Sequence, residues 1–295
     1  MNLNELALVV LNYNSYAMTI KCVDQLLSFS AGFHIVIVDN MSTDESYNKL
    51  VEYYDTFNVD VIETNYNGGY SAGNNVGIHF AEKKYSVKYV AIVNPDVIIP
   101  SLNVIKELVV TLENDDRCAI TGGSPIDREG VINPEHAAWK IPSMYEFIIS
   151  KSIFYRKKNK TKTSNTCRNI QVDCVAGCFF IIKIEALRAI NYMDEDLFMY
   201  DEEILLGFKL KNKGYTEILR TDLLYYHNHI PANSPTIKNY IGKRKIRFRS
   251  DVVLFKKVYS SKWGLLFLLF NEYLNRFVLF FWFLFKWIRQ GGKQK

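Results

Sequence analysis

The sequence predicts an α/β protein whose mostly parallel sheet is flanked by helices. Within the first 120 of its 295 residues, short β-rich runs alternate four times with longer helical patterns. Such alternation is typical of strand–helix–strand units, which place parallel strands between layers of helix. After Pro235 the pattern changes to long basic helix. We therefore expect a sheet domain over residues 1–235, with halves at about 1–120 and 121–235, and a basic, amphipathic helical region over 236–295.

Apolar runs and their punctuation predict the individual elements. In the first half the expected strands are 6–11, 35–39, 59–63 and 89–93, and the expected helices are 16–29, a segment from about 44, 71–83 and 101–114. In the second half, residues 172–182 have the pattern of one further strand. A short helix within 198–215, closed by Gly214, precedes a strand over 223–229. In sheets of this kind, ligands bind outside the carboxyl ends of the strands.

Charge is distributed unevenly along the chain. The formal net charge is +5, but residues 238–295 contain 14 Lys and Arg against Asp251 and Glu272, a net of +12, which leaves −7 for residues 1–237. A basic tail of this kind indicates contact with nucleic acid or an anionic membrane surface. The five cysteines form no CxxC pair, so neither a disulfide framework nor a zinc ribbon is indicated. We expect no secretion signal, because no basic stretch precedes the first apolar run.

The last apolar segment, residues 263–288, raises the question of a membrane span. Its centre contains Asn271, Glu272, Asn275 and Arg276 on one helical face, with Glu272 and Arg276 spaced to pair. Two central charges disfavour a simple span, which needs about 20 mainly apolar residues. A helix lying in the membrane interface, or a shallow hairpin, fits this pattern better. The aromatic residues favour lipid over nucleic acid as the partner of the basic tail.

Polar residues follow each of the first four predicted strands, where a ligand would bind. They are Asn12 and Asn14, then Asp39 and Asn40, then the loop at 65–77, and then Asn94 and Asp96. The loop reads NYNGGYSAGNNVG; its glycines let the backbone approach a ligand, and the helix that follows offers amide groups to phosphate. It matches neither GxxxxGK[ST] nor GxGxxG. A flexible connection is the alternative for this loop, and a helix cap or turn is the alternative for Asp39.

Three further clusters could carry chemistry. Asp96 could bind Mg²⁺ or Mn²⁺ together with phosphate oxygens, because hard cations take oxygen ligands; its alternative is an Asx-type turn. His227 and His229 share one face of a strand and could join Asp96 on the metal, or serve as hydrogen-bonded structural groups. Glu202 and Glu203 follow Asp201 at a predicted helix start. There they either complement the helix dipole or include a general base, ionised at neutral pH because the dipole lowers its pKa.

Taken together, these motifs resemble the inverting glycosyltransferases of family 2, most closely the rhamnosyltransferase-like members. The resemblance is carried by VVLNYN (9–14), VDNMSTDES (38–46), NYNGGYSAGNNVG (65–77), VNPDV (93–97), VAGCFFIIKIEAL (175–187), DEDLFMYDEEILLGFKLKNKGY (194–215) and YYHNH (225–229). It covers about residues 5–250 and implies a GT-A fold. The ordered series is far more specific than any single motif.

The resemblance implies roles for several of these residues. Asp39 would contact the base of a nucleoside diphosphate sugar, and Asp96 would bind the metal ion, with His227 as a further ligand and His229 as the second choice. The remaining residues expected in the nucleotide-sugar site are Asn12, Asn14, Asn67, Gly68, Gly73, Asn74 and Asn94.

The resemblance also suggests which carboxylate is the base. Relatives usually show Glu-Asp followed by Val-Asp after Phe-Met-Tyr, whereas this chain has Glu202, Glu203, Ile204 and Leu205. Glu203 therefore aligns with the base, and Glu202 is the alternative. The base would take the proton of the attacking hydroxyl while the metal stabilises the leaving nucleoside diphosphate, which suits a single inverting displacement.

The implied activity is transfer of a sugar, with L-rhamnose from dTDP-rhamnose as first choice, to a polyprenyl-diphosphate-linked glycan acceptor in O-antigen or capsule synthesis. We expect a cytoplasmic enzyme, peripheral on the inner face of the cell membrane, with an anionic membrane surface and no nucleic acid as partner. Two alternatives remain open. One is a nucleotidyltransferase, which would release diphosphate from a nucleoside triphosphate, and the other is a catalytically silent nucleotide-sugar-binding protein.

Overall fold

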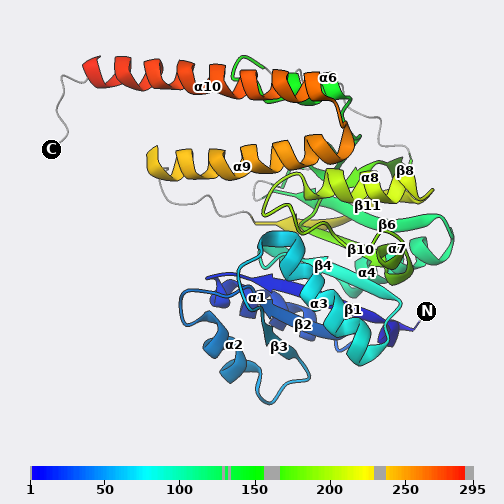
Figure 1. Cartoon of the computed structure of the whole chain (residues 1–295). Helices are drawn as coiled ribbons and strands as arrows, with labels where there is room; N and C mark the ends of the chain where they lie inside the picture. Colours follow the sequence, from blue (N-terminus) through cyan, green and yellow to red (C-terminus); the bar gives the residue numbers. More distant parts are fainter. Residues whose placement is uncertain (1, 128–129, 132–133, 156–166, 229–236, 290–295) are drawn as a thin grey trace.

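The computed structural model describes residues 2–127, 130–131, 134–155, 167–228 and 237–289, and it confirms the α/β fold class. Figure 1 shows a central sheet with helices on both faces and two long helices, α9 and α10, stacked at one end. The nine-stranded sheet has the order β3-β2-β1-β4-β10-β6-β11-β5, with β8 beside β11.

The N-terminal half of the sheet is parallel throughout, as the alternating pattern predicts. Its strands are β1 (Leu6–Asn12), β2 (His34–Asp39), β3 (Asp60–Glu63) and β4 (Tyr89–Val93), after a short 3₁₀ helix, Leu3–Glu5. The helices between and after them are α1 (Tyr16–Leu27), α2 (Ser46–Tyr54), α3 (Gly69–Tyr85) and α4 (Leu102–Glu113). Each lies within a few residues of its predicted range.

The C-terminal half of the sheet is mixed. β10 (Phe179–Lys183) runs antiparallel to both β4 and β6 (Cys118–Ile126). β11 (Thr216–His227) begins earlier than predicted; it is parallel to β6 and antiparallel to β5 (Val97–Ile98) and β8 (Asn169–Val172). The short helix α5 (Pro134–Ala137) precedes β7.

The prediction of one strand over residues 172–182 is wrong. β9 (Cys174–Val175) pairs with β7 (Ala138–Trp139) in a separate two-stranded sheet, and β10 starts only at Phe179. Residues 176–178 form the break between them. Two consecutive buried strands have the same apolar sequence pattern as one long strand. The break between them depends on their different partners, which lie far away in the chain.

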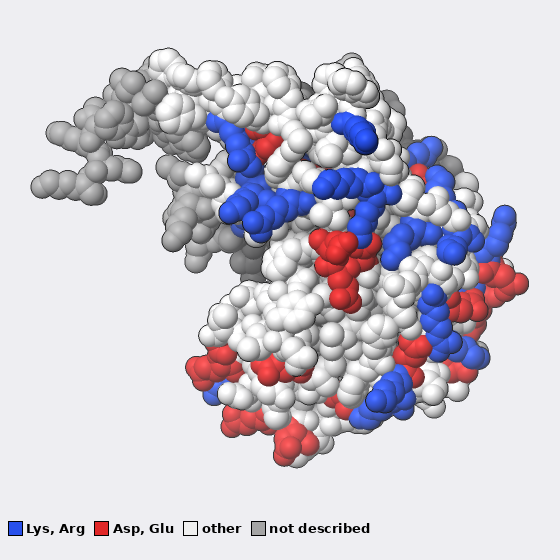
Figure 2. Space-filling model, in the orientation of Figure 1, with Lys and Arg blue, Asp and Glu red and all other residues white. Residues whose placement is uncertain are grey.

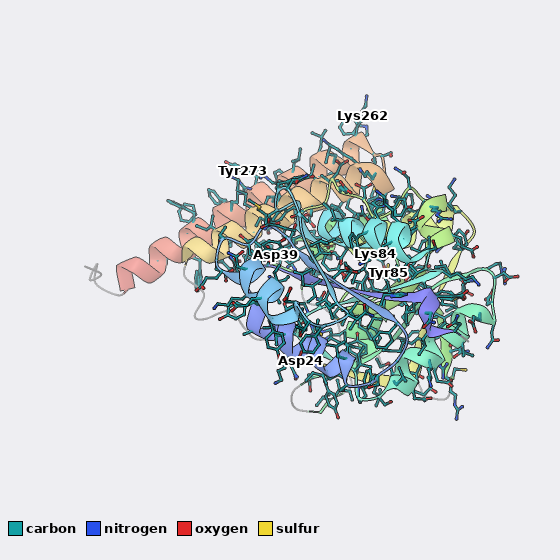
Figure 3. All side chains as sticks on the ribbon, turned by 90° about the horizontal axis from the view of Figure 1, so that it is seen from below. Asp24, Asp39, Lys84, Tyr85, Lys262 and Tyr273 are labelled. Atoms are coloured by element: carbon teal, nitrogen blue, oxygen red, sulfur yellow. The ribbon has the colours of Figure 1, made fainter. Side chains whose placement is uncertain are left out.

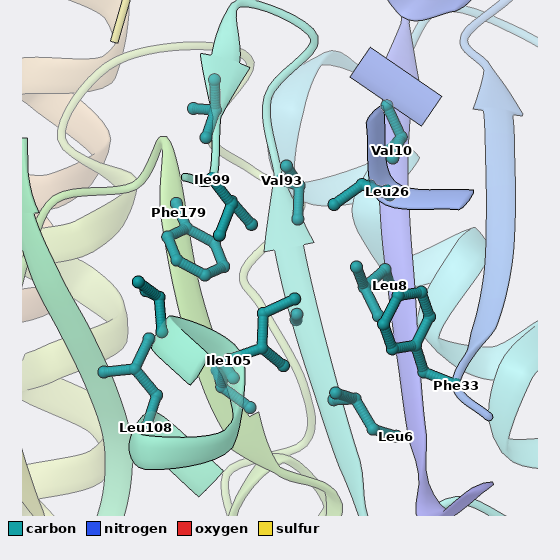
Figure 4. Close-up of a cluster of buried hydrophobic side chains, with 14 of the residues drawn as sticks. Leu6, Leu8, Val10, Leu26, Phe33, Val93, Ile99, Ile105, Leu108 and Phe179 are labelled. Atoms are coloured by element: carbon teal, nitrogen blue, oxygen red, sulfur yellow. The ribbon is translucent and has the colours of Figure 1, made fainter. Parts of the chain in front are cut away.

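Both faces of the main sheet are buried, which explains why its strands are continuous apolar runs. In β1, Leu6, Leu8 and Val10 face a cluster covered by α1, α2 and α4. Figure 4 shows this cluster, with side chains of α1 and α4 packed over β1, β4 and β10. Ala7 and Val9 face the opposite cluster, covered by α3, α7 (Ile184–Ala189) and α8 (Glu202–Asn212).

A third hydrophobic cluster attaches the C-terminal helices to the sheet domain. It joins α6 (Met144–Ser150) and α8 to α9 (Ile237–Val258) and α10 (Lys262–Arg289). Its buried centre includes Phe147, Leu205, Leu254, Phe255 and Leu268. The basic helix α9 therefore lies between the sheet domain and α10.

Helix α10 turns its polar stripe toward the protein. Asn271 Nδ2 donates to the carbonyl oxygen of Ile148 at 2.9 Å, and Asn275 Nδ2 donates to that of Lys151 at 2.8 Å. Glu272 pairs with Arg276 at 2.8 Å, as its spacing predicts, and also with Arg244 of α9. The polar groups in the centre of this helix are thus satisfied inside the protein.

The opposite face of α10 is apolar and exposed. Its exposed side chains include Trp263, Leu266, Phe267, Phe270, Tyr273, Phe277 and Phe280. Tyr273, which is 70% exposed, points away from the protein in Figure 3. Among the described residues, one helical stretch, 262–282, is long and apolar enough to cross a membrane by length and composition alone.

Close packing between α3 and the sheet gives a test of the fold. A Cβ added at Gly77 would lie 2.5 Å from Cγ1 of Val9 and 2.7 Å from Cγ2 of Val38. Alanine ordinarily stabilises a helix by about 0.5–1 kcal/mol relative to glycine, but overpacking a core costs about 1–3 kcal/mol. We expect Gly77→Ala to lower the free energy of unfolding by about 1–2 kcal/mol in urea titrations.

The matched control is Gly242→Ala in α9, where an added Cβ would meet nothing within 4 Å. That variant should be as stable as the wild type or more stable by about 0.5–1 kcal/mol. A Gly77→Ala protein that gains stability like the control would contradict the described packing.

Candidate functional site

Hydrogen bonds join the polar ends of β1 and β2. Asn12 Nδ2 donates to Asp39 Oδ1 at 2.6 Å, while the hydroxyl and backbone N–H of Ser42 donate to Oδ1 and Oδ2 at 2.7 and 2.8 Å. Asn12 Oδ1 accepts from the Thr19 hydroxyl at 2.8 Å. Asn12 and Asp39 are both 0% exposed. In this arrangement Asn12 orients Asp39, and a contact between Asp39 and a nucleotide stays a prediction.

Asn14 is the exposed member of the same group. It has a left-handed backbone (φ 52°), which asparagine tolerates well. Its Oδ1 accepts from the backbone N–H of Thr43 at 2.8 Å, and its Nδ2 donates to the Thr43 hydroxyl at 3.0 Å. These bonds fix the turns after β1 and β2 against each other, so the first two predicted clusters do meet.

The glycine loop meets the same edge of the sheet. Asn67 Oδ1 accepts from Asn40 Nδ2 and from the backbone N–H of Gly69, both at 3.1 Å. Gly69 has φ +86°, and a Cβ there would lie 1.9 Å from the carbonyl oxygen of Phe198. The Tyr70 N–H donates to that oxygen at 2.9 Å. The loop therefore packs directly on the Phe-Met-Tyr segment.

Close packing of the chain explains why the other two predicted positions, Gly68 and Gly73, are glycines. Asn74 is buried beside them. A Cβ at Gly68 would lie 2.6 Å from Ala72 Cβ, and one at Gly73 would lie 2.5 Å from Leu11 Cδ1. Asn74 is 0% exposed and donates to the Tyr70 carbonyl oxygen at 3.0 Å. Within the described part of the chain its Oδ1 has no hydrogen-bond partner.

Asp96 and His227 are brought together by the sheet. β5 begins directly after Asp96 and pairs with the end of β11, where Val97 lies opposite His227. Asp96 Oδ2 is 3.3 Å from His227 Nε2. Two hydrogen bonds raise the pKa of His227 to about 10: the bond to Asp96 has the larger effect, and the bond to Cys178 the next largest. The structure therefore brings these two residues together, and their joint binding of a metal stays a prediction.

The donor set of Asp96 and His227 suits a divalent cation that is also held by a ligand. Two adjacent ligands of an octahedral ion, with bonds of about 2.1 Å, lie about 3 Å apart, close to the observed separation. His227 would have to lose its proton on binding. No group of three or more candidate metal ligands occurs among the described residues, so phosphate or water oxygens would complete the shell. His229 lies outside the described residues.

Glu202 and Glu203 lie at the start of α8, as predicted, after a turn with two left-handed residues, Tyr200 (φ 80°) and Asp201 (φ 67°). Burial, and then the charge of Glu203, raise the pKa of Glu202 to about 8. Burial also raises the pKa of Glu203. The prediction that the helix dipole lowers the pKa of a base here is wrong, because loss of hydration outweighs the dipole.

The peptide link between Gly177 and Cys178 joins Glu203 to the Asp96–His227 pair. The Gly177 N–H donates to Glu203 Oε1 at 3.2 Å, and the Gly177 carbonyl oxygen accepts from the Tyr70 hydroxyl. The Asn94 N–H donates to the Cys178 carbonyl oxygen at 2.8 Å. Asn94 thus contributes its backbone to the site.

Sequence reasoning missed Tyr70, Cys178 and Tyr225. The Cys178 sulfur lies 3.1 Å from the Tyr225 hydroxyl and also forms a hydrogen bond with His227. One signal could have found this link, since Gly177 interrupts an apolar strand pattern, and a glycine there indicates a bulge or break.

Glu202 should make stability depend on pH. Its pKa is higher in the folded than in the unfolded chain, so the folded state keeps this proton longer. The free energy of unfolding therefore falls as pH rises from about 4 to about 8. Glu202→Gln removes this loss, and its stability relative to the wild type should rise over that window. At pH 8 the gain should be on the order of a few kcal/mol, because one pKa unit corresponds to about 1.4 kcal/mol.

Urea unfolding at pH 5 and pH 8 measures this difference. Glu52→Gln, on the exposed side of α2, removes the same charge and should give the same difference at both values. A Glu202→Gln effect that is equally independent of pH would show that the Glu202 carboxyl is ionised in the folded protein.

Known proteins are similar to this chain. Residues 7–190 match the family described as Glycosyl transferase family 2. The chain is 27% identical over 212 residues to the low-salt glycan biosynthesis hexosyltransferase Agl10 of Haloferax volcanii, covering 72% of this chain and 63% of that protein. It is 23% identical over 194 residues to the rhamnosyltransferase WbbL of Escherichia coli, covering 60% and 72%. The chain thus spans less than two thirds of the first of these relatives.

The fold has solved counterparts as well. The crystal structure of GalNAc-T7 with UDP, GalNAc and Mn²⁺ superposes with a TM-score of 0.59 at 17% identity, over 80% of this chain and 46% of that one. At this identity the likeness concerns the fold, and it agrees with the GT-A fold class. Because the family match covers more than half of the sequence, the chain belongs to glycosyl transferase family 2.

Proposed function

We propose that this protein transfers a hexose, with inversion, from a nucleoside diphosphate sugar to an acceptor hydroxyl. The observation that carries the proposal is the link at Gly177 and Cys178, which joins a carboxylate base candidate to the Asp96–His227 pair. The hexosyltransferase name of the Haloferax relative and the UDP and Mn²⁺ bound to GalNAc-T7 support this reading. Residues 1–235 would form the transferase domain.

Glu203 is the better candidate for the base. Residue Glu203 is half-buried and its Oε1 accepts from the Gly177 N–H, whereas Glu202 is buried and its Oε1 has no partner among the described residues. A raised pKa brings a carboxylate closer to the operating pH, where a general base is most effective. Glu203 would accept the proton of the attacking hydroxyl.

Asp96 and His227 would hold Mg²⁺ or Mn²⁺. The bound ion would supply positive charge to the leaving diphosphate. Asp39, Asn14 and Asn67 would contact the nucleotide from the ends of β2, β1 and β3, since their turns meet at that edge of the sheet. Asn12 would act on the nucleotide through Asp39, as a positioning residue.

The proposed donor rests on the similarity to a relative, and the proposed acceptor fits the C-terminal helices. We take L-rhamnose from dTDP-rhamnose as the first donor to test, because one relative is a rhamnosyltransferase. The acceptor would be a polyprenyl-diphosphate-linked glycan of a cell-surface polysaccharide, such as O-antigen or capsule. The exposed apolar face of α10 and the basic residues of α9 would dock residues 236–295 on an anionic cytoplasmic membrane surface.

A catalytically silent nucleotide-sugar-binding protein is the second candidate. The observation that favours it is Leu205, at a position where the resemblance to family 2 implies an aspartate. It is 2% exposed and packs in the third cluster. In this chain that position serves packing and carries no charge.

Turnover separates the two candidates. With a panel of nucleoside diphosphate sugars and Mn²⁺, we expect release of nucleoside diphosphate by the wild type. Glu203→Gln should lower kcat by about 10²–10⁴-fold, because the variant cannot accept a proton. Asp96→Ala should abolish the metal-dependent turnover. Glu202→Gln is the matched control and should retain turnover.

Two results would reassign these roles. Turnover that survives Glu203→Gln and is lost in Glu202→Gln would make Glu202 the base. A wild-type protein that binds a donor but turns over none would favour the silent protein.

Membrane docking is tested with point substitutions, because deleting α10 would expose the third hydrophobic cluster. Phe267 and Phe270 are each 63% exposed. Replacing both with serine should weaken flotation with anionic vesicles by more than tenfold, since each buried phenylalanine contributes about 1.5–3 kcal/mol. Phe57→Ser, at an exposed phenylalanine after α2, is the control and should float like the wild type. Unchanged flotation of the double variant would contradict docking through α10.

A further inference from the structure

A cavity of about 150 Å³ lies between α6, α9 and α10, outside the site described above. Side chains of both charges line it, chiefly Lys151, Arg244, Arg247, Asp251 and Glu272, together with Phe248. Figure 2 shows Lys and Arg side chains gathered on the surface over α9. A cavity of this composition is suited to a small charged group.

Positive charge is in excess around the cavity. Glu272 pairs with Arg244 and also with Arg276. Lys151 pairs with Asp251 at 2.5 Å. Arg247 forms no ion pair within the described part of the chain, and its guanidinium lies 4.6 Å from the centre of the Tyr200 ring. It is therefore a cation that is still available to a ligand.

The buried carboxyl in the cavity adds little negative charge. The Asp251 side chain is 6% exposed, and burial raises its pKa to about 7. When this carboxyl group is ionised, its charge is offset by its pairing with Lys151. An anion entering the cavity would meet less repulsion than the number of carboxyl groups suggests.

The cavity lies between the protein-facing polar stripe of α10 and the turn that begins the acid-bearing helix. Lys151 Nζ contacts Asp201 at 3.3 Å, and the Ser250 hydroxyl of α9 donates to the Met199 carbonyl oxygen at 2.6 Å. Arg247 stacks on Tyr200 of the same turn. Glu203 follows this turn by two residues. A group held in the cavity would therefore lie across α10 from its apolar face and beside the turn that leads to the proposed base.

We propose that this cavity binds the phosphate or diphosphate group of a membrane lipid, with Arg247 as its principal ligand. Guanidinium groups form strong, often bidentate hydrogen bonds to phosphate. A lipid held there would keep its chain along α10 and present a sugar attached to its diphosphate toward Glu203. The inference rests on the proposed function for this last step alone.

Binding of soluble lipid phosphates tests the proposal. The probes are farnesyl diphosphate and short-chain phosphatidylglycerol, measured by calorimetry without divalent cation on the full chain carrying Asp96→Ala, so that diphosphate has no metal-dependent site. Adding Arg247→Gln should weaken binding of farnesyl diphosphate by at least about tenfold, the usual effect of losing a charged hydrogen bond. Arg247→Lys should restore part of it.

Arg249→Gln is the matched control, because it removes the same charge from an exposed position of α9 that does not line the cavity. It should change binding by less than about twofold, since a single exposed charge contributes little. Equal losses in Arg247→Gln and Arg249→Gln would mean unspecific attraction to α9 and would overturn the proposal. So would farnesyl diphosphate that does not bind at all.

The two probes identify the source of the phosphate. Binding of farnesyl diphosphate alone, dependent on Arg247, indicates a prenyl diphosphate; equal Arg247-dependent binding of phosphatidylglycerol indicates a bulk lipid headgroup. Release of nucleoside diphosphate from sugar donors is measured separately, on Arg247→Gln with Asp96 intact. Donor turnover without lipid binding refutes only the cavity proposal. Lipid binding without any donor turnover refutes only the proposed transferase.

Discussion

The antiparallel pairing of β10 with β4 is the interaction on which the rest of the structure depends. All five residues of β10 are buried, and they pair in register from Phe179 opposite Val93 to Lys183 opposite Tyr89. Because β10 also pairs with β6, it joins the parallel N-terminal half of the sheet to the mixed half. The bond from the Asn94 N–H to the Cys178 carbonyl oxygen continues this pairing to the strand end, where Asp96 follows.

Packing against the sheet also determines the pKa values of the buried glutamates. Packing α8 against the sheet puts Glu202 and Glu203 where water is scarce, and Glu217 of β11 is likewise buried with a raised pKa. A helix N-terminus stabilises a carboxylate by about 0.3–1 kcal/mol, whereas burial can shift a carboxyl pKa by several units. Desolvation therefore prevails, and it keeps these carboxyl groups closer to the pH at which proton transfer is efficient.

Most of the fold could be predicted from the sequence, because periodicity is a local property. Strand runs such as 89–93 carry their own pattern, and the pairing of β5 with β11 brings Asp96 next to His227. What could not be predicted depends on partners distant in sequence. The break between β9 and β10 is set by pairing with β7 and β4, and the role of Gly73 is set by Leu11 on another element.

Helix α10 illustrates the same division between local pattern and distant partners. Its sequence predicts a polar stripe, but the stripe alone does not say whether water, headgroups or protein will receive it. Here the protein receives it, since α6 and α9 satisfy Asn271, Glu272 and Asn275. The exposed face then meets water mainly with apolar and aromatic side chains. Burying that face in lipid would remove apolar area from water and leave the polar contacts intact. The proposed membrane docking would therefore preserve this helix arrangement, and it would bring the charged cavity under α10 toward the lipid phosphates.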